Sequence, residues 1–276
     1  MNSTILLLSA SPLDQAKLRL DTEAREIEEG LRRFRHRDQF KLKKQGAVRI
    51  DDLRRFLLDA EPQIVHFCGH GTGEEGLVFE DQQGKTQLVS TDALTNLFEL
   101  FAGKIECVVF NACYSEVQAK AIIQHVGYVI GMNKVIGDKA AIKFSIGFYD
   151  ALGAGRSVEE AYKFGCNAIQ SEGISEYLTP ILKINTAWKY AVKLNLKPNF
   201  LTSTNPSDRF ALIKLLNDLP PQQLDVLLIS IKPTSGVIPP ITAPQGDRTA
   251  ALLRWAEGPT GCGFEQLQST LNQILG

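Results

Sequence analysis

The chain has 276 residues, 44% of them hydrophobic, which is enough for one large domain or for a medium domain with a small one. Thirty basic and 31 acidic residues leave a formal charge of -1, so no global field favours nucleic acid or an anionic membrane. No apolar run approaches the roughly 20 residues of a membrane span. The composition predicts a soluble globular protein with no nucleic-acid and no membrane partner.

The five cysteines are odd in number, irregularly spaced and free of any CxxC pair. The chain also shows no charged and then apolar leader, so we expect free thiols in a reducing cytosol. Cys68, His70 and Cys113 make fewer than four ligands and lack zinc-like spacing, so no metal is expected. Because the phosphate-binding pattern GxxxxGK[ST] is missing, no nucleotide cofactor is expected either.

Short apolar runs alternate with segments of helical periodicity over the first two thirds of the chain. Strands are predicted near residues 5–9, 63–68, 76–80, 86–89, 106–111, 128–132 and 180–185. Helices are predicted near residues 18–31, 53–57, 90–101, 116–124, 139–152 and 157–169. The basic run at 32–44 is assigned to a helix end and a connector, because acidic residues precede it and the whole chain is neutral.

This alternation is typical of an α/β domain with a mostly parallel sheet and helices on both faces, and we assign it to residues 1–190. The polar, proline-containing composition of residues 191–207 predicts a linker. Residues 208–276 show helical periodicity, prolines between the helices and no strand pattern. They predict a small all-helical domain.

Two predicted strands end in residues that carry chemistry. ECVVFNACYS (106–115) is an apolar run with Cys113 just past its tip, and QIVHFCGHGTG (63–73) ends in glycines around His70. A packed, inert cysteine is the alternative for Cys113, since free cysteine is among the most buried residue types. A histidine at a neighbouring strand end favours a reactive thiol, because imidazole lowers the pKa of a cysteine nucleophile.

Three motifs carry a family resemblance. HFCGHG, NAC and GxxxxIGDKAAxxFxxxFYxxLxxGxSVxxA together resemble the CHAT domain, a branch of the caspase-like cysteine peptidases that includes the separase core. The early segment SASPLDQAKLRLDTEAREI fits short stand-alone members, so the resemblance covers residues 1–190. The tail PPITAPQGDRTAALLRWAEGPTGCGFEQL resembles the effector-associated domain of bacterial conflict systems, a compact helical module likened to death domains.

The resemblance implies roles for individual residues. It makes Cys113 the nucleophile, His70 its imidazole partner, and the backbone N–H groups of Gly71 and Cys113 the oxyanion hole. Asp138 matches the acid of the primary specificity pocket, which implies cleavage after Arg or Lys. Asp138 as a simple cap of the helix starting at Lys139 remains open. Asn111 either orients a catalytic group or pairs with backbone, and no side chain stands out as a third catalytic member.

These observations predict a cysteine endopeptidase that cuts proteins after a basic residue. The helical tail would recruit a partner protein or activate the enzyme in a bacterial defence or cell-death pathway. The competing hypothesis is an inactive signalling scaffold, in which the sheet domain senses and the tail recruits.

Overall fold

The computed structural model describes residues 3–33, 37–186, 188–189 and 206–275. The chain divides into two compact units, Met1–Ile184 and Asn185–Gly276. The linker predicted at 191–207 lies outside the described residues except for its last two, which begin helix α8. Each unit is therefore described by itself.

The first unit is built on a six-stranded sheet with the strand order β2-β1-β3-β6-β7-β8. All neighbouring strands run parallel except β7 and β8, which are antiparallel. The strands are β1 (Ser3–Ser9), β2 (Phe40–Gln45), β3 (Ile64–Cys68), β6 (Cys107–Asn111), β7 (Tyr128–Met132) and β8 (Pro180–Ile184). The mostly parallel sheet predicted from the sequence is confirmed.

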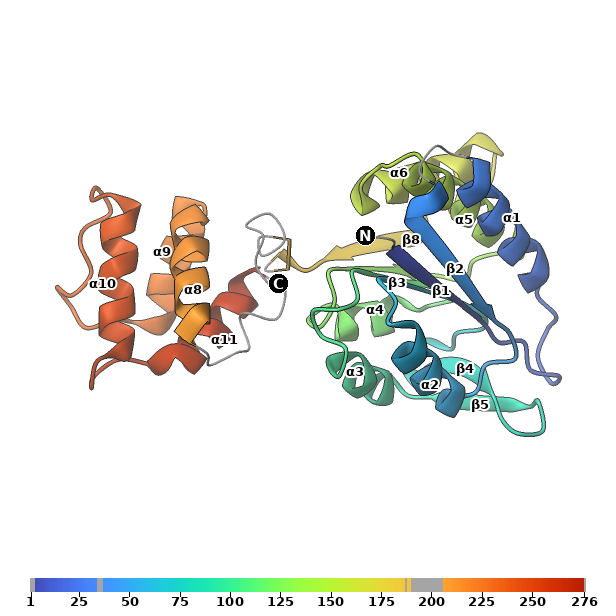
Figure 1. Ribbon diagram of the computed structural model, residues 1–276, viewed down its shortest axis with the longest axis horizontal. Coiled ribbons are helices and arrows are strands. Elements are labelled where there is room, and N and C mark those ends of the chain that lie inside the picture. Colours follow the sequence, from blue (N-terminus) through green and yellow to red (C-terminus); the bar gives the residue numbers. More distant parts are fainter. Residues whose placement is uncertain (1–2, 34–36, 187, 190–205, 276) are drawn as a thin grey trace. The chain divides into compact units, whose positions relative to one another are not determined.

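Helices cover both faces of this sheet (Figure 1). One face carries α1 (Leu20–Arg33), α5 (Asp138–Gly153) and α6 (Val158–Ser171). The other carries α2 (Ile50–Ala60), α3 (Thr91–Glu99), α4 (Glu116–Ile122) and the hairpin of β4 (Leu77–Glu80) and β5 (Thr86–Val89). Successive strand residues point to opposite faces, so Ile5 and Leu7 enter one core while Leu6 and Leu8 enter the other. The sheet is thus covered on both faces, and its inner strands β1, β3, β6 and β7 contain continuous apolar runs.

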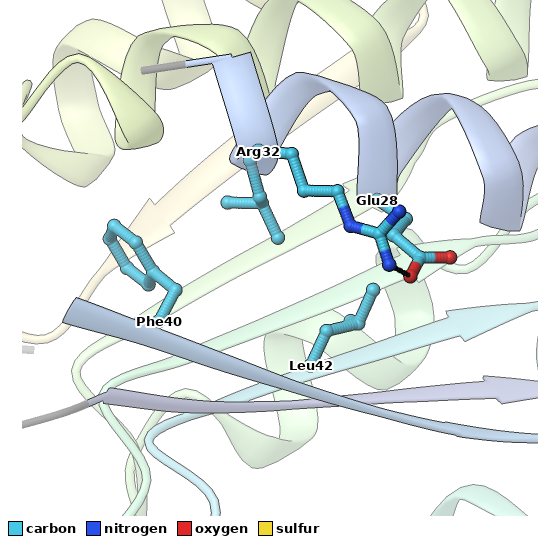
Figure 2. Close-up of a pocket in the computed structure, with 5 residues that line it drawn as sticks. Glu28, Arg32, Phe40 and Leu42 are labelled. Carbon is cyan, nitrogen blue, oxygen red and sulfur yellow. Dashed lines mark hydrogen bonds and ion pairs between the residues drawn. The ribbon is translucent and has the colours of Figure 1, made fainter. Parts of the chain in front are cut away.

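The basic run at 32–44 holds an edge strand that the sequence prediction missed. Strand β2 pairs with β1 in register Ser3 to Phe40, and Phe40 and Leu42 pack on the core. Figure 2 shows these two side chains facing α1 across a pocket of about 190 Å³, which is too small for a typical ligand site. Only two apolar residues alternate with lysines here, a weak pattern that suits an edge strand protected against further pairing.

The described part of the second unit is helical, as predicted for the tail. Its elements are α8 (Pro206–Asp218), α9 (Pro221–Ile231), α10 (Gln245–Glu257) and α11 (Gly263–Leu275). Leucines from all four pack around Trp255, and Arg248 pairs with Asp225 at 2.5 Å. None of the described helices combines the length and the apolar character needed to cross a bilayer.

Candidate active site

His70 and Cys113 leave the sheet side by side. Strands β3 and β6 are parallel neighbours, and Cys68 at the end of β3 lies opposite Asn111 at the end of β6. His70 and Cys113 each follow two residues later. Both strands are fully buried five-residue runs, so the sheet fixes where they end. The two predicted catalytic residues therefore belong to one edge of the sheet, on adjacent loops.

The two loops touch through their backbones. A methyl group on Gly71 would lie 2.2 Å from the carbonyl oxygen of Cys113, which is a steric clash. Only glycine, which has no side chain, fits at this position. The glycine after His70 is thus required by the close approach of the cysteine loop. Among the hydrogen bonds of the described residues, none uses the amide N–H of Gly71 or of Cys113. These two amides are the ones predicted to form the oxyanion hole.

A backbone carbonyl orients the imidazole of His70. The Nε2 atom of His70 lies 2.8 Å from the carbonyl oxygen of Ala16, in the loop between β1 and α1. A carbonyl oxygen can only accept, so Nε2 carries the proton and Nδ1 is the basic nitrogen of the ring. The sequence prediction missed this third group because a backbone carbonyl has no side-chain signature.

The thiol of Cys113 is half-buried beside the loop that follows β7. Its Sγ atom lies 3.8 Å from the carbonyl oxygen of Ile136, two residues before Asp138. The next residue, Tyr114, has φ of 56° and donates its backbone N–H to Lys134 at 3.1 Å. A positive φ at a bulky residue is strained and persists only where neighbours hold it. The turn that presents the thiol is thus tied to the loop that leads to Asp138.

Asp138 does not cap its helix. Helix α5 begins at Asp138 itself, with Gly137 as the N-cap residue and no side-chain capping bond, so the capping alternative is wrong. The carboxylate instead binds Arg19, accepting from the backbone N–H at 3.2 Å and from Nε at 2.5 Å. The two side chains are 30% and 58% exposed, so this pair faces solvent. Within this chain, the acid predicted to bind a basic side chain already holds one.

A buried polar network lies on the strands beneath the site. The Nδ2 atom of Asn111 donates to Glu23 Oε1 at 2.6 Å and to the Ala141 carbonyl at 3.1 Å. Ser145 donates to the same Glu23 oxygen at 2.6 Å, and His66 Nε2 lies 3.2 Å from it. Asn111 therefore joins helix α1 and helix α5 to the sheet. One of its hydrogen bonds is to backbone, as the pairing alternative predicts, and the others reach the side chains of Glu23 and Ser145.

Partners decide the charge states within this network. Burial raises the pKa of Glu23, but hydrogen bonds from His66, Ser145 and Asn111 and the charge of His66 outweigh it, leaving that pKa below 4.5. Burial and the neighbouring Glu23 carboxylate raise the pKa of the Cys68 thiol. A carboxylate oxygen of Glu23, a ring nitrogen of His66 and the sulfur of Cys68 all lie within 4.8 Å of one another. The sequence prediction did not identify this cluster. Contacts within it tie α1 to β3.

Comparison with known proteins identifies the sheet unit. The model of the CHAT domain matches residues 2–164. The chain belongs to the CHAT domain family. Its sheet unit has the caspase-like fold, with the mostly parallel sheet and the helices on both faces described above.

Two relatives share the CHAT region. One is a "Probable protease" of Gillisia limnaea, 28% identical over 170 residues, which are 60% of this chain and 30% of the relative. The other is a "Roc-COR-CHAT protease" of an unknown prokaryotic organism, 27% identical over 130 residues, which are 45% of this chain and 12% of the relative. The chain therefore spans less than a third of the length of either relative.

A solved structure resembles the CHAT chain in fold. It is a secreted C11 cysteine protease from Bacteroides thetaiotaomicron, in complex with an irreversible peptide inhibitor. The TM-score is 0.51 at 14% sequence identity, covering 86% of this chain and 72% of that one.

Proposed function

We propose that this CHAT chain is a cysteine endopeptidase that uses Cys113 as nucleophile and His70 as its base. The observation that carries the proposal is the pairing of β3 with β6, which brings both residues to one sheet edge. The names of the two relatives, both proteases, support the same reaction class. Protein or peptide substrates follow from that class.

Acylation begins with transfer of the Cys113 thiol proton to Nδ1 of His70. The Ala16 carbonyl supports this step, since it holds the proton of Nε2 and leaves Nδ1 free to accept. The thiolate attacks the carbonyl carbon of the scissile peptide, whose oxygen becomes an oxyanion. The N–H groups of Gly71 and Cys113 would stabilise that charge. The intermediate collapses when His70 gives its proton to the leaving amine.

In deacylation, His70 acts first as a base toward water and then as an acid toward the Cys113 thiolate. The thioester formed on Cys113 is attacked by a water molecule whose proton passes to Nδ1 of His70. The second oxyanion uses the same two amides, and the thiolate leaves and regains its proton from His70. The new carboxyl end dissociates and the dyad returns to its starting state.

Asp138 is proposed to bind the basic side chain before the scissile bond. Its helix begins two residues after Ile136, whose carbonyl lies next to the thiol. An acid at this place suits a guanidinium or an ammonium group, and Arg19 already occupies it with a guanidinium. Cleavage after Arg or Lys is the specificity that this arrangement supports.

The helical tail is proposed to act as an effector-associated interaction module in a bacterial defence or cell-death pathway. The tail has a hydrophobic core made of its own residues, which supports an independently folded module. Self-association of such a module would raise the local concentration of the peptidase. Five free thiols support a reducing compartment such as the cytosol.

Cleavage of fluorogenic peptides by the full chain tests the function. Peptides with Arg or Lys before the reporter group are expected to be cut, and peptides with Asp or Leu there are not. Cys113→Ala is expected to abolish cleavage. Asp138→Asn is expected to lower kcat/KM for the arginine peptide by about tenfold or more, because the negative charge that pairs with the arginine of the peptide is removed. Equal turnover by Cys113→Ala, or unchanged selectivity in Asp138→Asn, contradicts the corresponding part of the proposal.

An arginine-based electrophilic ketone separates the peptidase from a silent signalling scaffold. A peptidase with a working dyad is expected to form a covalent adduct at Cys113, detected by mass spectrometry of the intact chain. The matched control is His70→Ala, which keeps the thiol and removes its base. Equal labelling of the parent and His70→Ala would mean that the thiol reacts without the dyad. No labelling of the parent would favour the scaffold.

A further inference from the structure

The loop between β1 and α1, residues 10–19, runs along the catalytic edge. Its first part is fixed to the β4–β5 hairpin, where Ser11 N–H donates to Glu80 at 2.9 Å and Leu13 N–H to Gly84 at 2.8 Å. Asp14 then accepts two hydrogen bonds from Thr86, both at 2.9 Å. The β1–α1 loop therefore has a defined path before it reaches His70.

The second part of this loop contacts both ends of the proposed site. The carbonyl of Ala16 accepts from His70, and three residues later Arg19 binds Asp138. The loop thus spans from the catalytic imidazole to the acid of the proposed specificity pocket. With the roles proposed for His70 and Asp138, a peptide substrate would bind along the same stretch.

The end of the loop is held firmly by the helix that it begins. Glu23 donates its backbone N–H to the carbonyl of Arg19 at 3.1 Å in the first turn of α1. The Glu23 side chain is only 4% exposed and sits in the buried network with Asn111 and Ser145. The backbone of Arg19 is therefore fixed, while its side chain is more than half exposed.

Arg19 binds the two oxygens of Asp138 in different ways. Oδ1 accepts from the backbone N–H of Arg19, a bond that the anchored backbone preserves. Oδ2 accepts from the Nε atom of a side chain that is 58% exposed. An exposed ion pair is weak because water competes for both partners. Oδ2 of Asp138 is thus oriented to accept from a guanidinium, and the Arg19 guanidinium that it now binds can be displaced.

We propose that Arg19 is a specificity-determining residue that occupies the pocket of Asp138 in place of the substrate's basic side chain. The inference rests on the proposed function of Asp138. Arg19 competes most strongly with a charged side chain, because both pair with the Asp138 carboxylate, so it weakens binding of arginine substrates and narrows their advantage over uncharged ones. Its removal leaves Oδ1 held by the backbone and opens Oδ2 to the substrate.

The test compares the full-length parent with Arg19→Ala on two peptides that differ only in arginine or citrulline before the scissile bond. Citrulline keeps the shape of arginine and lacks its charge. Arg19→Ala is expected to lower KM for the arginine peptide by about two- to fivefold, which corresponds to the free energy of an exposed ion pair. It is expected to lower KM for the citrulline peptide by a smaller factor. Arg33→Ala is the matched control, because Arg33 lies at the far end of α1, the helix that follows Arg19, and pairs with exposed Glu29.

A binding measurement makes the test independent of turnover. In the Cys113→Ala background, titration calorimetry with the arginine peptide is expected to show tighter binding when Arg19→Ala is added. The gain is expected to vanish when Asp138→Asn is present as well, since the competitor and the substrate share that carboxylate. Arg33→Ala is expected to bind as the parent does.

Two outcomes overturn the inference. Equal affinities of the parent and Arg19→Ala for the arginine peptide mean that Arg19 does not compete for the pocket. Weaker binding of both peptides in Arg19→Ala means that Arg19 is an anchor of α1. If Asp138→Asn still loses the arginine preference, the proposed function stands and only the role of Arg19 fails. If Asp138→Asn keeps that preference, the pocket itself is wrong.

Discussion

The motif HFCGHG places two histidines four residues apart in opposite environments. His66 lies inside β3, fully buried, with Nδ1 2.9 Å from the hydroxyl of Tyr149 and Nε2 beside Glu23. His70 lies past the strand end, where Nε2 meets a backbone carbonyl. The cysteines divide in the same way, because Cys68 is buried and Cys113 is half-buried on a loop. Residue type alone therefore does not separate His66 and Cys68 from His70 and Cys113, the pair that we propose to be reactive; position relative to the strand end does.

The largest expected effect contrasts the two histidines in stability. His66→Ala removes a fully buried side chain whose Nδ1 lies 2.9 Å from the Tyr149 hydroxyl and whose Nε2 lies 3.2 Å from Glu23, so the free energy of unfolding is expected to fall by about 3 kcal/mol. His70→Ala removes a side chain at the sheet edge and is expected to change that free energy by less than about 1 kcal/mol. Urea unfolding followed by circular dichroism measures both.

The effects of the two substitutions on activity are expected to have the opposite order, with the larger loss in His70→Ala. His70→Ala is expected to lower kcat by about 10²–10⁴-fold, the usual contribution of a general acid and base. His66→Ala, assayed at a temperature where it remains folded, is expected to keep more activity than His70→Ala. Loss of stability in His70→Ala comparable to that in His66→Ala would contradict the comparison.

The next effect concerns the close approach of the two loops. Gly71→Ala would set a methyl group 2.2 Å from the Cys113 carbonyl, so the cysteine loop has to shift. A displacement of about 1 Å in a catalytic group costs on the order of 100-fold in rate, and kcat/KM is expected to fall by that amount. Gly46→Ala is the control, since its new methyl group would lie 3.6 Å from Ser9 Oγ, an ordinary contact. Equal activities of the two variants would rule out a role for the Gly71 contact.

A smaller effect appears in the pH dependence of stability. The pKa of Glu23 is below 4.5 in the folded chain, so its ionised form contributes stability above pH 4.5. That contribution is expected to fade as the pH drops from 4.5 through the lowered value. Burial raises the pKa of Glu106, which acts in the opposite sense and makes a single curve ambiguous.

Glu23→Gln isolates the contribution of Glu23 to this curve. The difference in unfolding free energy between the parent and Glu23→Gln is expected to narrow steadily as the pH falls below 4.5. Chemical denaturation at a series of pH values measures it. A constant difference across that range would show that the Glu23 charge does not stabilise the fold.

The mildest test needs no substitution. Cys113 is expected to react with iodoacetamide before Cys68 and Cys107, because burial raises the pKa of both of those thiols and shields them. Mass spectrometry of tryptic peptides follows the rates in the native chain and in urea, where the three should react alike. Early labelling of Cys68 or Cys107 in the native chain would mean that the strands open.

Local pattern in the sequence was enough for much of the fold. Apolar runs located β1, β3, β6 and β7, because strands buried on both faces have to be apolar. A shorter run located the edge strand β8. The capping box of Ser157 and Glu160, which starts α6, was also readable, since both partners lie within four residues. The edge strand β2 escaped because its two apolar residues give too short an alternation.

The sequence by itself determined that a histidine and a cysteine follow two buried strands. The tertiary structure decided that those strands are neighbours, that Ala16 orients His70, and that Arg19 occupies Asp138. Strand order is set by packing and pairing over the whole sheet, and a backbone carbonyl looks the same in every residue. Arg19 and Asp138 stand 119 positions apart, so no periodicity connects them, and only the folded chain brings the charges together.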